Sequence, residues 1–235
     1  MLFMLLAGCT NDIFEDLDIE NDNTVAILEA DGKTLTYGDN YYVLNETEDI
    51  TTVTFTHFPA TRREFESLQE KLLGKSRPGT LALELMAFEM YRRNRVKGEK
   101  CIKLCTLSAQ ATMAISQLSQ KFPEHRGDAL TDGYMQPYLI ASFLVGATEA
   151  NGYQPDYPYV FSFKYSDSPY DKQAEYSRTY WGTIYYYYTN RNGKTDKSTD
   201  ASVIVPDDGT YVMVRNCPNY YYSAVPIRTW EDTLK

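Results

Sequence analysis

Histidine is scarce in this sequence, and its scarcity limits the chemistry that the protein can perform. The 235 residues include only two, His57 and His125, and neither has a second histidine close to it in the sequence. No H-E-x-x-H or C-x-x-C spacing occurs, so no metal site is predicted. No G-x-S-x-G sequence occurs either, and a serine or cysteine nucleophile would have to recruit a distant imidazole. The sequence therefore predicts no catalytic residue, no metal ion and no cofactor.

Basic residues and long apolar runs are limited as well. The chain has 23 Lys and Arg against 32 Asp and Glu, which gives a net charge of −9. A protein held by phosphate contacts needs a basic face, so this charge argues against a nucleic-acid partner. No apolar run is long enough to cross a bilayer. The apolar share of 43 % is ordinary for a globular protein.

Cysteine is also rare, with four residues in the chain. Cys101 and Cys105 lie four apart on an expected helix, which places both on one face at a separation near the upper limit for a bridge. In an exported protein, one of these two could instead form a disulfide with Cys217. The alternative is that all three are small buried hydrophobic residues.

The fourth cysteine ends the opening stretch M-L-F-M-L-L-A-G-C. A secretory signal has a basic start, an apolar middle and a small-residue cleavage site, and only the basic start is missing here. The run Leu6-Ala7-Gly8-Cys9 resembles the lipobox of bacterial lipoproteins. That resemblance implies that residues 1–8 are the remnant of a signal peptide and that Cys9 is lipidated. The alternative is a buried N-terminal strand with an inert cysteine.

Residues 10–24 are acidic, with six Asp or Glu and no basic residue. Such a run repels itself and stays solvated, so residues 9–24 are interpreted as a tether between a membrane and a domain. An acidic run directly after a lipidated cysteine resembles the surface-export signal of Bacteroidetes lipoproteins. It implies a lipid anchor in the outer membrane of the cell envelope, with the protein facing outward. A solvated leader without an addressing role is the alternative.

The expected domain, residues 25–235, begins with strands. The runs 25–30 and 33–37 flank Asp31-Gly32, a pair suited to a type I′ hairpin turn. Two more runs with strand composition follow at 41–44 and 50–55. The first part of the domain is therefore predicted to be β.

Helical spacing begins after residue 60. Thr61 and Glu64 fit a capping box, and Gly74 stands where a C-terminal cap is expected. A second helix is predicted for about 80–95, a short segment at 101–104, and a third long helix that ends before Pro123. The basic residues from Arg92 to Lys103 are interpreted as a solvated helix end.

Strand-type runs return after residue 134, at 142–145, 159–165, 177–189, 202–205 and 210–215. Asn192-Gly193 and Asp208-Gly209 supply turns between the last three. The pattern predicts an antiparallel meander of about five strands, and strands segregated from helices indicate a single α+β domain with a layer of three to four helices.

One segment of the C-terminal half carries a motif. Residues 146–159 read G-A-T-E-A-N-G-Y-Q-P-D-Y-P-Y. The segment resembles a G-A-T-x-x-N-G-Y-x-P-x-x-P-Y pattern of an uncharacterised family of Bacteroidetes and Firmicutes proteins, often lipoproteins, classed as a domain of unknown function. The resemblance implies an α+β fold and assigns no catalytic residue. A turn at Asn151-Gly152 and two stiffening prolines give the segment a structural role on physical grounds alone.

Tyrosine is abundant, with 21 residues. In the run 181–189, alternation places Trp181, Tyr185 and Tyr187 on one face of a strand, where they could form a ligand surface. Cross-strand aromatic pairing that only stabilises the sheet is the alternative. Asp232-Thr233-Leu234 resembles the O-glycosylation motif of exported Bacteroidetes proteins, which makes Thr233 a possible glycosylation site.

These patterns lead to two hypotheses for function. The first is a lipid-anchored protein of the cell envelope that is not an enzyme and that acts as a binding or structural accessory, with a glycan or an envelope protein bound through its tyrosine-rich sheet. The alternative is a carboxylate-dependent hydrolase that acts on glycans, because 32 acidic residues offer many carboxylate pairs.

Overall fold

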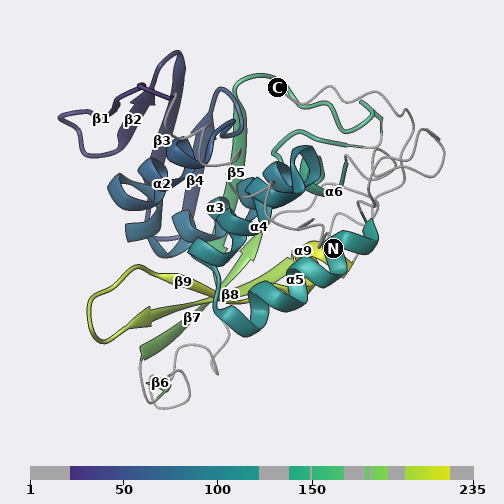
Figure 1. Ribbon diagram of the computed structural model, residues 1–235. Coiled ribbons are helices and arrows are strands. Elements are labelled where there is room, and N and C mark those ends of the chain that lie inside the picture. Colours follow the sequence, from purple (N-terminus) through teal and green to yellow (C-terminus); the bar gives the residue numbers. More distant parts are fainter. Residues whose placement is uncertain are drawn as a thin grey trace, which may run out of the picture.

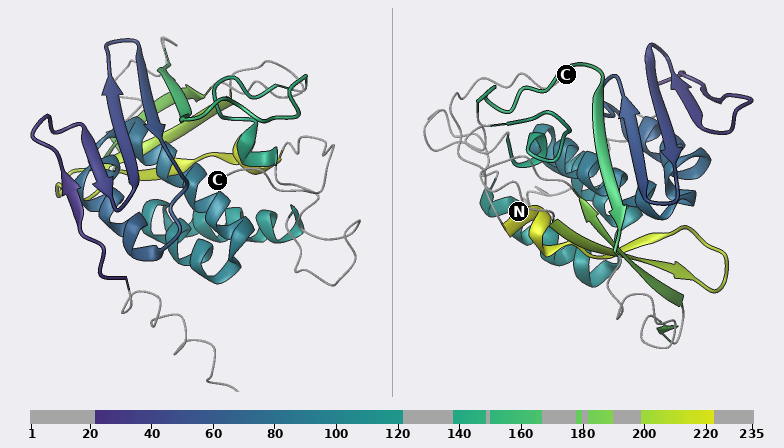
Figure 2. Two further views of the ribbon diagram at one scale, coloured as in Figure 1. Left: turned by 90° about the horizontal axis from the view of Figure 1, so that it is seen from above. Right: turned by 180° about the vertical axis from the view of Figure 1, so that it is seen from behind.

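A single antiparallel sheet extends through both halves of the chain, and helices cover one of its faces (Figures 1 and 2). The computed structural model describes residues 22–121, 138–148, 150–166, 178–179, 182–189 and 199–222. The predicted α+β class is confirmed. Within the described residues the strands are β1 (Ala26–Leu28), β2 (Thr34–Tyr37), β3 (Asn40–Glu46), β4 (Ile50–Phe55), β5 (Tyr159–Tyr165), β6 (Arg178–Thr179), β7 (Gly182–Thr189), β8 (Thr199–Pro206) and β9 (Met213–Asn216).

The sheet is larger than the predicted meander of about five strands, because the N-terminal strands belong to it as well. Its strand order is β1-β2-β3-β4-β5-β7-β8-β9, with β6 paired to β7. β4 pairs with β5, although a long helical part of the sequence separates them. The last three residues of β5 also pair with β7. β5 is therefore the strand that joins the two halves of the sheet.

The N-terminal hairpin is confirmed, but its turn is not type I′. Only Gly32 of the central pair has a positive φ, of 65°. The Asp31 carboxylate accepts hydrogen bonds from the backbone N–H groups of Lys33 and Thr34, at 2.8 and 2.9 Å. These bonds to its own backbone stabilise a different, wider turn, as is common for aspartate.

The helical layer begins close to where the sequence predicts, but two predictions are wrong. The segment at 101–104 is not short, because it belongs to a helix of 11 residues, Arg95–Cys105. Gly74 does not cap α2, because the chain continues into a 3-10 turn in which Gly74 packs against the backbone of Gln69. Pro123 lies outside the described residues. The described helices are α2 (Arg62–Lys71), the turn η1 (Leu73–Lys75), α3 (Arg77–Arg93), α4 (Arg95–Cys105), α5 (Ser108–Lys121), α6 (Tyr138–Ala141) and α9 (Pro218–Tyr222).

The N-terminus of α2 is joined to the sheet through its cap. Thr61 accepts a hydrogen bond from the Glu64 N–H at 3.1 Å, as the capping box predicts. The Glu64 carboxylate binds the backbone N–H of Ala60 at 2.9 Å instead of that of Thr61, and it also accepts from the Tyr42 hydroxyl at 2.8 Å. Glu64 thereby connects α2 to β3.

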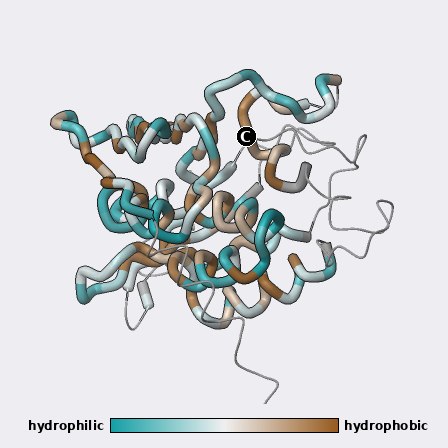
Figure 3. Tube along the Cα trace, turned by 45° about the horizontal axis from the view of Figure 1, so that its top comes forward, coloured by the Kyte–Doolittle hydropathy of each residue, from teal (hydrophilic) through white to brown (hydrophobic). Residues whose placement is uncertain are grey.

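The helix α3 lies at the centre of the molecule. It contacts β4, β8 and β9, strands that run in different directions because the sheet bends at β5 (Figure 2). Every residue from Pro78 to Tyr91 is buried. The predicted wide apolar face is therefore covered on all sides, which is typical of a helix inside the core. Hydrophobic positions gather along the helices and strands that face one another, while the outer turns are more hydrophilic (Figure 3).

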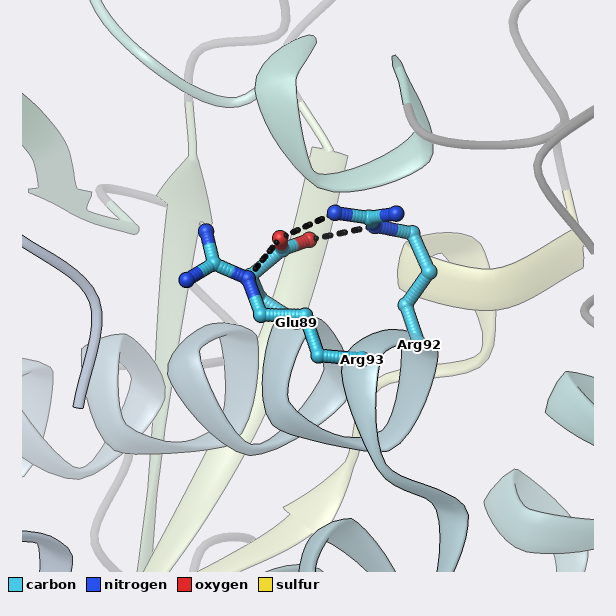
Figure 4. A network of polar contacts seen from close by, with 3 residues as sticks. All are labelled: Glu89, Arg92 and Arg93. Carbon is cyan, nitrogen blue, oxygen red and sulfur yellow. Dashed lines mark hydrogen bonds and ion pairs between the residues drawn. The ribbon is translucent and has the colours of Figure 1, made fainter. Parts of the chain in front are cut away.

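Two charged residues at the end of α3 do not follow the prediction of a solvated end. Glu89 is fully buried, and it binds Arg92, whose side chain is only 3 % exposed, at 2.6 Å. Arg93, which is 31 % exposed, binds the same carboxylate at 2.7 Å (Figure 4). The solvated interpretation is therefore wrong for Arg92, since a carboxylate one turn earlier neutralises it inside the protein.

The described part of the chain begins at Asp22, which is already bonded to the domain. Its carboxylate accepts hydrogen bonds from Tyr37 at 2.5 Å, from Thr61 at 2.8 Å and from the Thr24 N–H at 3.0 Å. Burial by itself would raise the pKa of Asp22, but these hydrogen bonds outweigh it and lower the pKa to about 2. Asp22 thus joins the domain although the sequence assigns it to the tether.

Candidate functional site

A pocket of about 400 Å³ lies where the β3–β4 turn, the N-terminus of α3 and the ends of β5 and β7 meet. Its walls come from segments far apart in the sequence, which the bend at β5 brings together (Figure 1). We refer to it as the tyrosine pocket. It is lined by Glu46, Thr47, Glu48, Asp49, Thr51, Arg77, Pro78, Tyr165 and Tyr187.

Two tyrosines form the aromatic wall of the tyrosine pocket. Tyr165 and Tyr187 stand opposite each other in the β5–β7 register, and their ring centroids are 5.4 Å apart in an edge-to-face arrangement. Tyr187 is only 5 % exposed. Burial raises the pKa of Tyr187 to about 12, although Arg77 acts in the opposite direction. The hydroxyl is therefore protonated at neutral pH and is able to donate a hydrogen bond.

A third tyrosine lies beside the wall and positions Arg77. The Arg77 guanidinium stacks over the Tyr185 ring, 4.2 Å from its centroid. Stacking of this kind holds a guanidinium in place while leaving its N–H groups free to point elsewhere. Tyr185 therefore contributes to the pocket indirectly, through the cation that lines it.

Another part of the lining, the acidic wall, consists of Glu46, Glu48 and Asp49. Glu46 is held at the N-terminus of α3, because the capping residue Ser76 donates its hydroxyl to the Glu46 carboxylate at 2.6 Å and accepts from the Gly79 N–H at 3.1 Å. The exposed residues Glu48 and Asp49 follow in the β3–β4 turn. Thr47 closes this turn with two hydrogen bonds to Ile50, and the carboxylates consequently project from a rigid segment.

The arrangement suits a polar ligand with a ring. Tyrosine faces can pack against apolar C–H surfaces, and carboxylates accept hydrogen bonds from hydroxyl or amino groups. The volume also falls within the range of about 300 to 1,000 Å³ that is usual for small-molecule sites. Among the described residues, no group of three or more His, Cys, Asp or Glu could hold a metal ion.

Residues 57–228 match the family model for a domain of unknown function, DUF6935. The chain belongs to this family. The DUF6935 region begins at His57, directly after β4, so it contains the helical layer and the strands from β5 onward, whereas β1–β4 precede it. The expectation of an uncharacterised family is thereby confirmed. Neither the curated proteins nor the solved structures contain a match to this chain.

The tyrosine pocket crosses the boundary of the DUF6935 region. Arg77, Tyr165 and Tyr187 lie inside the region, and the acidic wall from Glu46 to Asp49 precedes it. The N-terminal strands therefore complete a site that the DUF6935 residues only begin.

The motif segment of the DUF6935 region folds as a self-bonded loop. Asn151 accepts a hydrogen bond from the Thr148 N–H at 2.9 Å and donates one to the Gly146 carbonyl at 2.8 Å. Tyr153 is 1 % exposed, so it anchors the loop in the core. These contacts use the polar groups of Asn151 for the loop itself. The predicted strand at residues 142–145 is wrong: this stretch is a turn, with a single bridge from Leu144 to Phe161.

The structure places only part of the predicted site. Tyr185 and Tyr187 lie in β7 on the side of α3, while Trp181, Cys9 and Thr233 lie outside the described residues. β7 offers no fully exposed aromatic face, because Tyr187 is buried and the other described tyrosines of the strand are partly covered. No sequence pattern indicated that Tyr165, Arg77 or the acidic wall would join them, since β5 and the β3–β4 turn are distant from β7 in the chain.

The described histidine and cysteines do not line the tyrosine pocket. His57 lies two residues after β4, and its Nδ1 is 2.7 Å from the Asn40 side-chain oxygen. His125 lies outside the described residues. Cys101, Cys105 and Cys217 are free thiols and are all buried, which agrees with the alternative to a disulfide. No described helix is both long and apolar enough to span a membrane.

Proposed function

We propose that the protein is a lipid-anchored, non-catalytic binding protein of the cell envelope, and that its tyrosine pocket binds a glycan. The observation that carries the proposal is that the Tyr165–Tyr187 wall and the three carboxylates of the acidic wall line the same pocket. A sugar presents apolar C–H faces and a rim of hydroxyl groups, and these two walls complement both.

A glycan fits the site better than an envelope protein does. Specific protein interfaces bury about 800 Å² on each partner and are mostly broad surfaces with an apolar centre. The tyrosine pocket is concave and is lined with charged groups. Its volume of about 400 Å³ suits a small polar ligand such as a short glycan rather than a protein surface.

The pocket can be tested without disturbing the fold, because Glu48 and Asp49 are exposed turn residues. We expect the double variant Glu48→Gln, Asp49→Asn to bind at least about tenfold more weakly to the glycans that the wild type recognises on an immobilised oligosaccharide panel, since two charged hydrogen-bond acceptors are lost. Titration calorimetry with the best oligosaccharide measures the change.

The matched control is Asp39→Asn, an exposed acidic residue in the β2–β3 turn, outside the pocket. It should bind like the wild type. A wild-type protein that recognises no oligosaccharide, or a double variant with unchanged affinity, would contradict the proposed ligand.

A carboxylate-dependent hydrolase is the second candidate, and the same three carboxylates favour it. Glycoside hydrolysis needs a pair of them, one acting as an acid. Incubating the recognised oligosaccharide with the wild type and measuring new reducing ends separates the two candidates. Binding without release supports the non-catalytic function; release that is lost in the double variant supports the hydrolase.

The membrane anchor is proposed on the sequence of residues 1–24, with its lipobox-like Leu6-Ala7-Gly8-Cys9 and acidic run. We expect metabolic labelling with a fatty-acid analogue to mark the wild type and not Cys9→Ala, because the thiol is the acylation site. The variant should also leave the membrane fraction, since loss of the lipid removes its hydrophobic attachment. The control Cys101→Ala should keep the label. Label retained in Cys9→Ala would refute the anchor.

Orientation and glycosylation are parts of the same proposal. If the protein faces outward, a protease added to intact cells should degrade it. O-glycosylation at Thr233 stays a prediction, and a mass shift of the wild type that is absent in Thr233→Ala would support it.

A further inference from the structure

Three side chains converge on a buried carboxylate in the core, away from the tyrosine pocket. Glu84, on α3, is 0 % exposed. One of its oxygens accepts a hydrogen bond from the Cys105 thiol at 3.1 Å, and the other accepts from the Cys217 thiol at 3.5 Å. The Thr106 hydroxyl also donates to it. All three donors are neutral.

The two thiols come from segments that are already joined. Cys105 is the last residue of α4, and Cys217 directly follows β9. Between them, Thr106 forms a bridge with Val214, and the Leu107 N–H donates to the Val214 carbonyl at 3.0 Å. This backbone contact brings the two segments together three residues before Cys217, and the two thiols then meet at the same carboxylate, each on a different oxygen of Glu84.

The third described cysteine has other neighbours. Cys101 lies one turn before Cys105 on α4, and the charged groups that act on it are Arg62, Glu66 and Lys97. Its backbone carbonyl accepts a hydrogen bond from the Cys105 thiol at 3.5 Å. Among the described residues, however, the hydrogen bonds to Glu84 come from the thiols of Cys105 and Cys217 and not from that of Cys101.

We infer that Cys105 and Cys217 are a redox pair, which a small disulfide such as oxidised glutathione converts into an intramolecular disulfide. One thiol attacks the small disulfide, forms a mixed disulfide and releases one glutathione thiol. The second protein thiol then attacks the mixed disulfide and releases the other. Two electrons pass to the small disulfide, and the two protein protons end on the two thiols released. The inference does not depend on the proposed glycan site.

Burial slows this reaction because it suppresses ionisation of the two thiols, and the nearby Glu84 charge suppresses it further. The pKa values of Cys105 and Cys217 are raised well above the usual value, firstly by burial and then by the Glu84 charge. The thiolate is consequently rare, and local opening or proton transfer to Glu84 has to precede the attack. Equilibration over many hours is expected for the wild type.

Oxidation changes the surroundings of Glu84. Burial already raises its pKa to about 7, against the hydrogen bonds from Thr106, Cys105 and Cys217. The disulfide removes two of these three donors, so the pKa of Glu84 is higher in the oxidised protein than in the reduced one. The other titratable group that faces Glu84 is Tyr220, whose own pKa is raised by burial, so it stays neutral in this range.

Forming the disulfide above pH 7 therefore requires that Glu84 takes up a proton. At fixed concentrations of reduced and oxidised glutathione, the ratio of oxidised to reduced protein should fall as the pH rises above 7, by at most about tenfold for each pH unit. In Glu84→Gln this dependence should disappear, because the amide does not titrate.

The experiment uses the full chain with Cys9→Ala, so that the leader thiol does not interfere. The protein is equilibrated with glutathione buffers, quenched with acid and an alkylating reagent, and mapped by mass spectrometry. We expect one disulfide between the Cys105 and Cys217 peptides, together with an alkylated Cys101. Added Cys101→Ala should leave the disulfide intact, and added Cys217→Ala should abolish it.

Two results would overturn the inference. One is complete alkylation of all three cysteines after equilibration with oxidised glutathione alone; the other is a disulfide that contains Cys101. If the disulfide forms but its pH dependence is the same in Glu84→Gln, the coupling to Glu84 is wrong. Should Glu84→Gln fail to fold, the wild-type pH dependence and the Cys217→Ala variant still decide the matter.

Discussion

Replacing Glu89 with glutamine should lower the free energy of unfolding by about 3 kcal/mol. The Glu89 carboxylate is fully buried and receives two bonds from Arg92, at 2.6 and 3.0 Å, and one from Arg93 at 2.7 Å. The glutamine keeps the shape of the side chain but not its charge, so the buried Arg92 guanidinium loses its counter-charge. Urea unfolding followed by circular dichroism measures the difference.

The two arginines supply an internal comparison. Because Arg92 is 3 % exposed and Arg93 is 31 % exposed, Arg92→Met should cost more than Arg93→Met. The double variant Glu89→Gln, Arg92→Met should be less destabilised than the sum of the two single variants, since the second change removes the charge that the first leaves buried. A Glu89→Gln protein within about 0.5 kcal/mol of the wild type would show that the network contributes little.

Gly98→Ala should destabilise the protein by at least about 3 kcal/mol or prevent folding. A Cβ atom at Gly98 would lie 2.1 Å from the Cα atom of Tyr91 and 2.2 Å from its backbone nitrogen. Neither is the end of a flexible side chain that could move aside. α3 and α4 would have to separate, which would open the packing around the central helix.

Gly98 lies so close to Tyr91 because the connection between α3 and α4 is short. Asn94 is the only residue between them: its N–H donates to the Met90 carbonyl at 2.7 Å, and its side chain caps α4 by accepting from the Lys97 N–H at 3.1 Å. With so short a link, the first turn of α4 must cross the last turns of α3 directly.

A control on α4 separates packing from helix propensity. Lys103→Ala changes an exposed position of the same helix, with 62 % of the side chain accessible, and it should alter stability by no more than about 0.5 kcal/mol. Alanine is intrinsically a better helix former than glycine by about 1 kcal/mol. A stabilised Gly98→Ala protein would therefore mean that the helices do not pack as closely as described.

Local patterns in the sequence predict much of the fold. The Thr61 cap, the apolar spacing of the helices and the alternation in β4 and β5 depend on neighbouring residues, and all of them appear in the structure. The turn type at Asp31-Gly32 could not be predicted in this way, because the aspartate side chain accepts hydrogen bonds from the backbone of the turn and stabilises another turn type. The same holds for Arg92, whose burial depends on packing that a single helix does not reveal.

The residues of the tyrosine pocket could be predicted from the sequence only in part. Tyrosine content pointed to β7, and Tyr187 does line the tyrosine pocket. Its partners Tyr165 and Glu46 enter only through the pairing of β5 with both β4 and β7. Nothing in the spacing of residues along the chain encodes which distant strands become neighbours, so the pocket could not be assembled from the sequence.

The position of β5 also bears on how the chain folds. Phe55 of β4 pairs with Tyr159 of β5. This pairing cannot form until the helical layer and the motif loop, which lie between the two strands in the sequence, have been synthesised. Closing so long a loop is entropically costly, and chains dominated by such distant pairings fold slowly. Until then β4 has an unpaired edge that other chains can join. The strands β1–β4 are therefore exposed to aggregation during synthesis, and the acidic residues that precede them would keep that segment soluble.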